Sequence, residues 1–237
     1  MTSSDSAYAA IQERVARAAG RAGHPVCLLA VSKTKPAAAV AALAQLGQRD
    51  FGENYVQEAI AKRLELGPVL AAAAGAACAH PSTIWHLIGP LQSNKCREVA
   101  ENFDWLQSLD REKLIAPLNR FRRADRSPLN VLVQVNIDDE TSKSGCHPDR
   151  IEALADAIAK APQLQLRGLM AIPQPHPELA LRRDAFRRMR QLFERLQTNH
   201  PAIDTLSLGM SDDFETAIEE GATLVRVGTA LFGKRQA

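Results

Sequence analysis

The chain has 237 residues, of which 46% are hydrophobic and 24% charged, the balance of an ordinary soluble globular protein with enough apolar side chains for a large core. The formal net charge of +2 and the aromatic content of 5% exclude a nucleic-acid-binding surface, and no apolar stretch is long and uncharged enough to span a membrane. The four cysteines form no closely spaced pair, which argues against a zinc site or a disulfide framework and predicts a cytoplasmic protein.

Hydrophobic periodicity predicts a regular succession of helices and strands. The chain opens with an amphipathic helix over residues 6–19. Strands are predicted at residues 26–33, 50–51, 83–89, 104–109, 130–136, 166–172, 205–208 and 223–227. Helices are predicted between them at residues 37–46, 55–66, 93–102, 111–122, 148–161, 178–197 and 212–220. The segment 67–82 is rich in Ala, Gly and Pro and is expected to be a surface insertion, a loop with a short piece of helix.

Strands that alternate with helices predict a parallel sheet with right-handed crossovers. Eight such units in a chain of this length are typical of the α/β class and of a (β/α)8 TIM barrel, here with an extra N-terminal helix. We expect one domain over residues 1–237. The alternative is a doubly wound open sheet, which would need a glycine-rich loop after the first strand; the chain has Lys33-Thr34-Lys35-Pro36 there.

Lys33 ends the first predicted strand, where its amine would be partly desolvated and able to attack an aldehyde. A lysine that simply extends into solvent from a strand end explains the same pattern. Side-chain alternation along the strands predicts that Lys33, Asn136 and Arg226 point into one barrel mouth. His86 either joins them or is a hydrogen-bonded core histidine.

The loops after the seventh and eighth strands are candidate phosphate-binding loops, as in many barrels. Ser211 either caps the next helix or offers its hydroxyl to a phosphate. Gly228 allows close backbone approach, and Thr229 begins a helix whose free amides attract an anion. Because the first and eighth strands adjoin in a closed barrel, these groups would face the same cavity as Lys33. A lysine opposite an anion cradle predicts a ligand that carries an aldehyde and a phosphate, namely pyridoxal 5′-phosphate.

Several stretches of the chain resemble the pyridoxal phosphate homeostasis protein family. They are residues 28–36, 51–58, 85–95, 168–172, 206–213 and 225–233. The resemblance implies a barrel similar to the N-terminal domain of alanine racemase, with pyridoxal phosphate held on a lysine as an internal aldimine. The cofactor-binding residues that it implies are Lys33, Asn54, Ser211, Arg226, Gly228 and Thr229. Among them, Arg226 would meet the pyridine nitrogen, and Ser211, Gly228 and Thr229 would hold the phosphate.

An arginine at the pyridine nitrogen argues against catalysis. Arg226 only donates hydrogen bonds, so it would keep the ring nitrogen unprotonated and the ring a poor electron sink. Racemases of this fold add a second domain and a tyrosine base from a partner subunit. The chain ends shortly after Gly233, so neither is expected here.

Few other groups could act as a second base. Of the two tyrosines, Tyr55 could lie near the mouth and Tyr8 could not; Lys35 and Lys143 are expected to be exposed loop lysines. The predicted function is therefore a monomeric, non-enzymatic protein that holds pyridoxal phosphate for the homeostasis of vitamin B6 and, indirectly, of amino acids. A pyridoxal-phosphate-dependent amino-acid racemase and a cofactor-independent lysine aldolase remain the alternatives.

Overall fold

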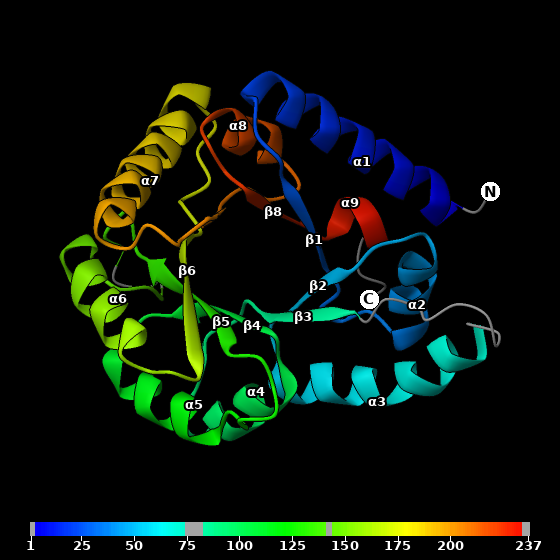
Figure 1. Cartoon of the computed structure of the whole chain (residues 1–237). Coiled ribbons are helices and arrows are strands. Elements are labelled where there is room, and N and C mark those ends of the chain that lie inside the picture. The colour runs from blue at the N-terminus through cyan, green and yellow to red at the C-terminus, as the bar shows by residue number, and fades with distance from the viewer. Residues whose placement is uncertain (1–2, 74–82, 141–143, 234–237) are drawn as a thin grey trace.

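The computed structural model describes residues 3–73, 83–140 and 144–233, in which eight parallel strands close into a barrel in chain order (Figure 1). The strands are β1 (Cys27–Val31), β2 (Asp50–Glu53), β3 (Ile84–Leu87), β4 (Trp105–Leu109), β5 (Leu129–Val135), β6 (Leu164–Ala171), β7 (Thr205–Ser207) and β8 (Leu224–Val227). Pairing of β1 with β8, with Leu29 opposite Arg226, closes the ring. The predicted TIM barrel is thus confirmed.

Helices surround the barrel and cover its outer face (Figure 1). They are α1 (Ser3–Ala22), α2 (Ala37–Gln45), α3 (Val56–Ala73), α4 (Cys96–Asn102), α5 (Ile115–Phe121), α6 (Ile151–Ala159), α7 (Leu179–Asn199), α8 (Phe214–Glu219) and α9 (Thr229–Phe232). Short 3-10 turns precede α4, α5 and α6 at Ser93–Lys95, Glu112–Leu114 and Pro148–Arg150. The predicted extra N-terminal helix is α1, which packs against α8 and α9.

Helix α3 is longer than its sequence pattern predicts. It was expected to end near residue 66, but it continues to Ala73. The helix continues through Gly67 and Pro68, two poor helix formers, so these residues do not end it as the sequence pattern suggested. The rest of the predicted insertion, residues 74–82, lies outside the described residues.

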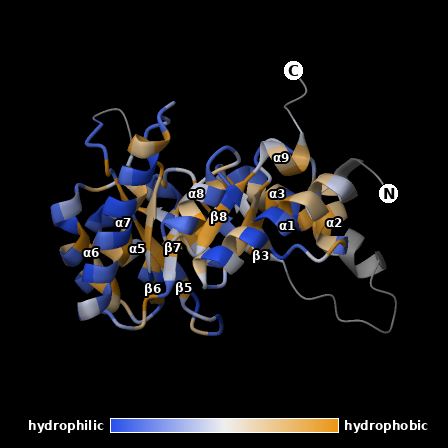
Figure 2. Cartoon of the chain, turned by 90° about the horizontal axis from the view of Figure 1, so that it is seen from above, coloured by the Kyte–Doolittle hydropathy of each residue, from blue (hydrophilic) through white to orange (hydrophobic). Residues whose placement is uncertain are grey.

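The core has two layers. Strand residues that face outward pack against the apolar sides of the helices, whose outer surfaces are hydrophilic (Figure 2). A second set of buried side chains fills the barrel itself, and its apolar members are Leu29, Leu132, Met170 and Leu224. Several polar side chains share this interior, and they connect to the site described next.

Candidate functional site

A cavity of about 190 Å³ opens at the carboxyl ends of the strands. It is lined by Val31, Lys33, Asn54, Ile88, Ile172, Met210, Ser211, Arg226, Gly228 and Thr229. All six residues expected to bind a cofactor are in this set. Residues from six different strand ends therefore meet in one small space, which is the usual location of a binding site in this fold.

Lys33 reaches the cavity from a loop and not from the strand itself. The first strand was expected to run to Lys33, but β1 ends at Val31. The amide of Ser32 still donates to the carbonyl of Gly52 at 3.0 Å, and then Thr34 turns the chain with a φ of 63°. The left-handed conformation of a non-glycine residue needs support from its surroundings.

That support comes from a buried lysine that the sequence pattern did not reveal. The ammonium of Lys62 donates to the carbonyl of Ser32 at 2.7 Å, to Oε1 of Glu53 at 2.7 Å and to Oε1 of Glu58 at 2.6 Å. The hydroxyl of Ser32 also donates to Glu53, and the amide of Thr34 donates to Glu58. The cluster fixes the backbone on both sides of Lys33. Only the Glu58–Lys62 spacing of four residues could have signalled part of it.

Arg226 is buried beside the cavity, with 3% of its surface exposed. Its Nη1 donates to the carbonyl and the hydroxyl of Ser207 at 2.9 and 2.6 Å, and its Nη2 donates to the carbonyl of Ala171 at 2.8 Å. Burial lowers the pKa of the guanidinium to about 10, which leaves it cationic at neutral pH. Of its five N–H donors, two make no hydrogen bond within the described residues and remain for a ligand.

The loops after β7 and β8 contact one another at Ser211 and Gly228. The amide of Gly228 lies 3.4 Å from Oγ of Ser211 and donates to it. Ser211 does not cap the next helix, because α8 begins at Phe214. A Cβ on Gly228 would lie 3.2 Å from the carbonyl oxygen of Val31, so glycine permits the close approach to β1. Together with Thr229, the first residue of α9, these groups form a small polar cradle.

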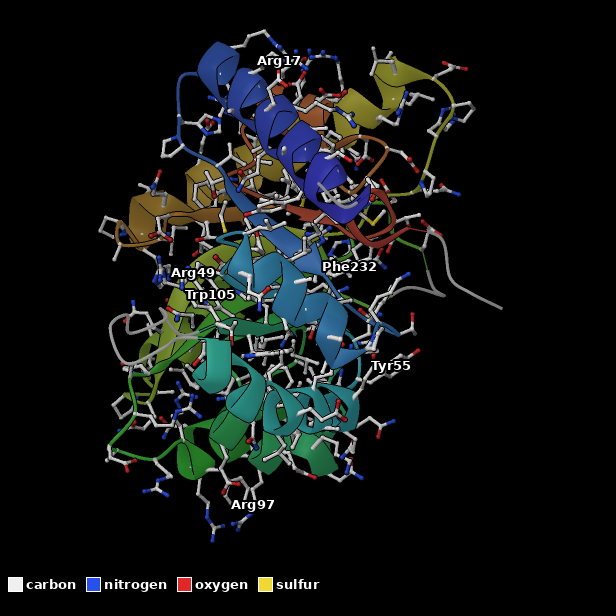
Figure 3. The ribbon with its side chains drawn as sticks, turned by 90° about the vertical axis from the view of Figure 1, so that its right-hand side faces the viewer. Arg17, Arg49, Tyr55, Arg97, Trp105 and Phe232 are labelled. Carbon is white, nitrogen blue, oxygen red and sulfur yellow. The ribbon has the colours of Figure 1, made fainter. Side chains whose placement is uncertain are left out.

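Asn54 connects this cavity to a neighbouring one of about 280 Å³. The second cavity is lined by Asn54, Tyr55, Val56, Gln57, Pro90, Gln92 and Lys95. Tyr55 is 60% exposed and projects from the carboxyl end of the barrel (Figure 3). Tyr8 is buried elsewhere, where its hydroxyl donates to Gln48. As expected, Tyr55 lies near the mouth of the barrel and Tyr8 does not.

His86 is a core histidine and does not line the cavity. It is 1% exposed, stacks on Trp105 with ring centroids 5.1 Å apart, and hydrogen-bonds Asp50 and Gln107. The structure therefore decides between the two interpretations of this residue. Its partners lie on β2 and β4, which adjoin β3 on either side.

Two other expectations for the mouth are wrong. Asn136 does not line the cavity; its side chain closes its own loop by donating to the carbonyl of Glu140 at 2.8 Å. Lys35 is not an exposed loop lysine, because it is half-buried and its ammonium donates to the carbonyl of Phe232 at 3.0 Å. Lys143 lies outside the described residues.

Two kinds of feature were not found in the part of the chain that the structure describes. No helix there combines the length and the hydropathy needed to cross a membrane. No group of three or more His, Cys, Asp or Glu side chains there is arranged to hold a metal ion.

Comparison with known proteins places the chain in a family. Residues 7–236 match the family described as alanine racemase, N-terminal domain. The chain is 53% identical over 220 residues to the pyridoxal phosphate homeostasis protein of Pseudomonas aeruginosa, which covers 93% of this chain and 89% of that protein. The chain belongs to the pyridoxal phosphate homeostasis protein family.

Further members of the family support the same assignment. The pyridoxal phosphate homeostasis protein of Escherichia coli K12 is 49% identical over 233 residues, covering 96% of this chain and 94% of its own. Among solved structures, PipY of Synechococcus elongatus PCC7942 with PLP bound superimposes with a TM-score of 0.82 at 36% identity, covering 97% of this chain and 100% of PipY. The family resemblance expected from the sequence motifs is therefore confirmed.

Proposed function

We propose that this chain binds pyridoxal 5′-phosphate on Lys33 and serves in the homeostasis of this cofactor, and so of vitamin B6 and, indirectly, of amino acids. One observation carries the proposal. The amine of Lys33, the guanidinium of Arg226 and the cradle of Ser211, Gly228 and Thr229 line a single cavity. The names of the homologues and the PLP bound in PipY support the choice of ligand.

The chemistry of the lining residues fits the parts of the ligand. The neutral amine of Lys33 attacks the aldehyde and forms a Schiff base with loss of one water molecule. The hydroxyls of Ser211 and Thr229 and the amide of Gly228 are donors for phosphate oxygens. Arg226, which can only donate, suits an unprotonated pyridine nitrogen as acceptor. Hydrolysis of the Schiff base returns the free aldehyde, so binding is reversible.

We further propose that the chain is not an enzyme. Apart from Lys33, the residues that line the cavity include no carboxylate, imidazole, thiol or phenol in the described part of the chain. Arg226 stays protonated and cannot accept a proton. A racemase needs two groups that exchange protons with the substrate, and the described residues that line the cavity include one, Lys33. The homologues are named as homeostasis proteins.

Absorbance spectroscopy tests the covalent link. Wild-type protein incubated with pyridoxal phosphate should show a band near ~420 nm, as lysine Schiff bases of this cofactor do. Lys33→Ala should abolish the band. Lys160→Ala is the matched control, because Lys160 is exposed at the end of α6, and it should leave the band intact. A colourless wild-type protein would refute the proposal and favour the cofactor-independent aldolase.

Hydrogen exchange tests the absence of catalysis. The loaded protein is incubated with single L-amino acids in deuterium oxide, and deuterium at the α-carbon is measured by mass spectrometry. We expect no exchange above the rate with free pyridoxal phosphate. Exchange that requires the protein would establish the racemase alternative.

We also propose that residues 1–237 form one domain and that the protein is a monomer in the cytoplasm. Cys27, Cys96 and Cys146 are free thiols, which suits a reducing compartment. Light scattering coupled to size-exclusion chromatography should give the mass of one chain, 25.8 kDa. A mass of twice that value would refute the monomer.

A further inference from the structure

A chain of hydrogen-bonded polar side chains runs through the barrel interior, away from the cavity. It starts at Arg226, whose Nη1 lies 2.6 Å from Oγ of Ser207. Oγ of Ser207 lies 2.8 Å from Oε1 of Gln107, and Nε2 of Gln107 lies 3.0 Å from Nδ1 of His86. Nε2 of His86 lies 3.0 Å from Oδ1 of Asp50. Four hydrogen bonds thus join five residues from five strands.

This chain of hydrogen-bonded side chains crosses the barrel from one end to the other. Arg226 lines the cavity at the carboxyl ends of the strands, whereas Asp50 is the first residue of β2. His86 stacks on Trp105, the first residue of β4. Figure 3 shows Trp105 at the end of the barrel opposite Tyr55, which projects beside the mouth.

The hydrogen bonds follow one direction, from Arg226, which can only donate, to the carboxylate of Asp50, which only accepts. Because Arg226 donates to Ser207, that hydroxyl has its own proton free to donate to the carbonyl oxygen of Gln107. The amide nitrogen of Gln107 then faces Nδ1 of His86, which must accept. The proton of the imidazole is therefore on Nε2, where it is donated to the carboxylate of Asp50.

The hydrogen bonds of Ser207, Gln107 and His86 are shielded from solvent. Ser207 and Gln107 have no exposed surface, and His86 is 1% exposed. In such surroundings a broken hydrogen bond leaves a donor or acceptor that water cannot satisfy. The hydroxyl of Ser207 is thus held in one rotamer by Gln107, and that rotamer presents a lone pair to Arg226.

We infer that Gln107 is a positioning residue: acting through Ser207, it holds the guanidinium of Arg226 in the orientation that meets the pyridine nitrogen of the bound cofactor. The inference rests on the proposed function, and it assigns to a residue outside the cavity a role in the affinity for the ring. His86 completes the chain by accepting from the amide of Gln107, which prevents the amide from rotating.

The test compares two glutamines that are both buried in the barrel. Gln107→Met keeps the length of the side chain and removes both hydrogen bonds. Gln134→Met is the matched control, because Gln134 is 6% exposed on β5 and its side chain donates to the carbonyl of Ser144, outside the chain of bonds. Each purified variant is titrated with pyridoxal phosphate and with an analogue in which a C–H group replaces the ring nitrogen.

The analogue distinguishes positioning from general damage. Gln107→Met should weaken binding of pyridoxal phosphate by about tenfold, the order expected for a buried hydrogen bond to a charged group, and shift its absorption maximum. Its affinity for the analogue should equal that of the wild type, since Arg226 has no ring nitrogen to meet. Gln134→Met should bind both ligands as the wild type does. Unchanged affinity for pyridoxal phosphate, or an equal loss for both ligands, would overturn the inference.

A second variant keeps the test valid if Gln107→Met folds poorly. Ser207→Ala by itself removes the hydroxyl between the two residues, so it should also weaken binding of pyridoxal phosphate by about tenfold and leave the affinity for the analogue unchanged. Unchanged affinity for pyridoxal phosphate, or an equal loss for both ligands, would contradict the inference. Failure of the proposed function is a separate result: wild-type protein would then show no Lys33-dependent binding of pyridoxal phosphate.

Discussion

The ammonium of Lys62 lies 2.7 Å from the carboxylate of Glu53, and both side chains are almost completely buried. Lys62 also donates to the carbonyl of Ser32, the residue before Lys33. Burial raises the pKa of Glu53, and the hydrogen bonds from Lys62 and Ser32 oppose that rise. The ion pair therefore links the stability of the barrel to the position of the lysine at its mouth.

Lys62→Met should destabilise the protein strongly. It leaves the carboxylate of Glu53, which is 0% exposed, without a cation, and breaking one side of a buried pair costs about 3–5 kcal/mol. Urea unfolding at pH 7 measures the loss. The double variant Lys62→Met/Glu53→Gln is the control and should recover part of it, because no buried charge remains.

The loss of unfolding free energy caused by Lys62→Met should be smaller at low pH. With the cation removed, the pKa of Glu53 in the folded state rises further above its unfolded value of about 4.3. A carboxyl with a raised pKa stabilises the fold in its protonated form below the unfolded pKa, and that contribution is lost as the pH rises through the folded pKa. Urea unfolding of the variant and the wild type at pH 5 and pH 8 measures this difference. An equal loss of unfolding free energy at both pH values would contradict the prediction.

Glu219 should show the opposite pH dependence. It joins three helices, because it accepts hydrogen bonds from Arg183 on α7 and Arg21 on α1. The hydrogen bond from Arg183, followed by that from Arg21, lowers the pKa of Glu219. Its contribution to stability is present above the unfolded pKa of about 4.3 and is lost as the pH falls through the lower folded value.

Thermal unfolding between pH 7 and pH 3 tests this contribution. In Arg183→Gln the midpoint temperature should be lower at pH 7 and should fall less on acidification than in the wild type. Arg17→Gln is the control, since Arg17 pairs with Glu13 on the exposed side of α1, and such pairs contribute little. Identical pH curves for Arg183→Gln and the wild type would refute the role of Glu219.

Gly89→Ala should weaken cofactor binding through Asn54. A Cβ at Gly89 would lie 2.3 Å from the carbonyl oxygen of Asn54, so the backbone of Asn54 must move. Because Asn54 lines the cavity, we expect about tenfold lower affinity for pyridoxal phosphate. Gly67→Ala has no neighbour within 4 Å of its new Cβ and should leave the affinity unchanged. Absorbance titration distinguishes the two, and equal affinities would contradict the prediction.

Cys27 should react slowly with alkylating reagents. Burial, followed by the negative charge of Asp50, raises the pKa of its thiol to about 12. Its thiolate fraction at pH 7 is then roughly a thousandfold below that of an ordinary cysteine. Mass spectrometry after timed iodoacetamide treatment should show Cys27 labelled in urea and protected in the folded protein. Equal labelling rates in the two states would disprove the shift.

Local patterns in the sequence were sufficient to predict the barrel and its mouth. Hydrophobic periodicity is set by neighbours in the chain, so it predicted eight strands, the helices between them and the extra helix α1. Strand order in a closed barrel then brought Lys33, Arg226 and Gly228 to one end. The boundary errors lie at β1, which ends two residues earlier than predicted, and at α3, which continues through Gly67 and Pro68.

Only the tertiary structure decided what holds those residues in place. The hydrogen bond from Ser207 to Gln107, on the path that starts at Arg226, joins positions 100 residues apart, and no local pattern marks such a pair. The same holds for Lys62, whose burial depends on the carbonyl of Ser32 and on Glu53, two residues of other elements. A sequence by itself determines which side chains can bind a ligand, because that is a property of residue type and spacing. Their orientation depends on hydrogen bonds that form only when the strands have closed around them.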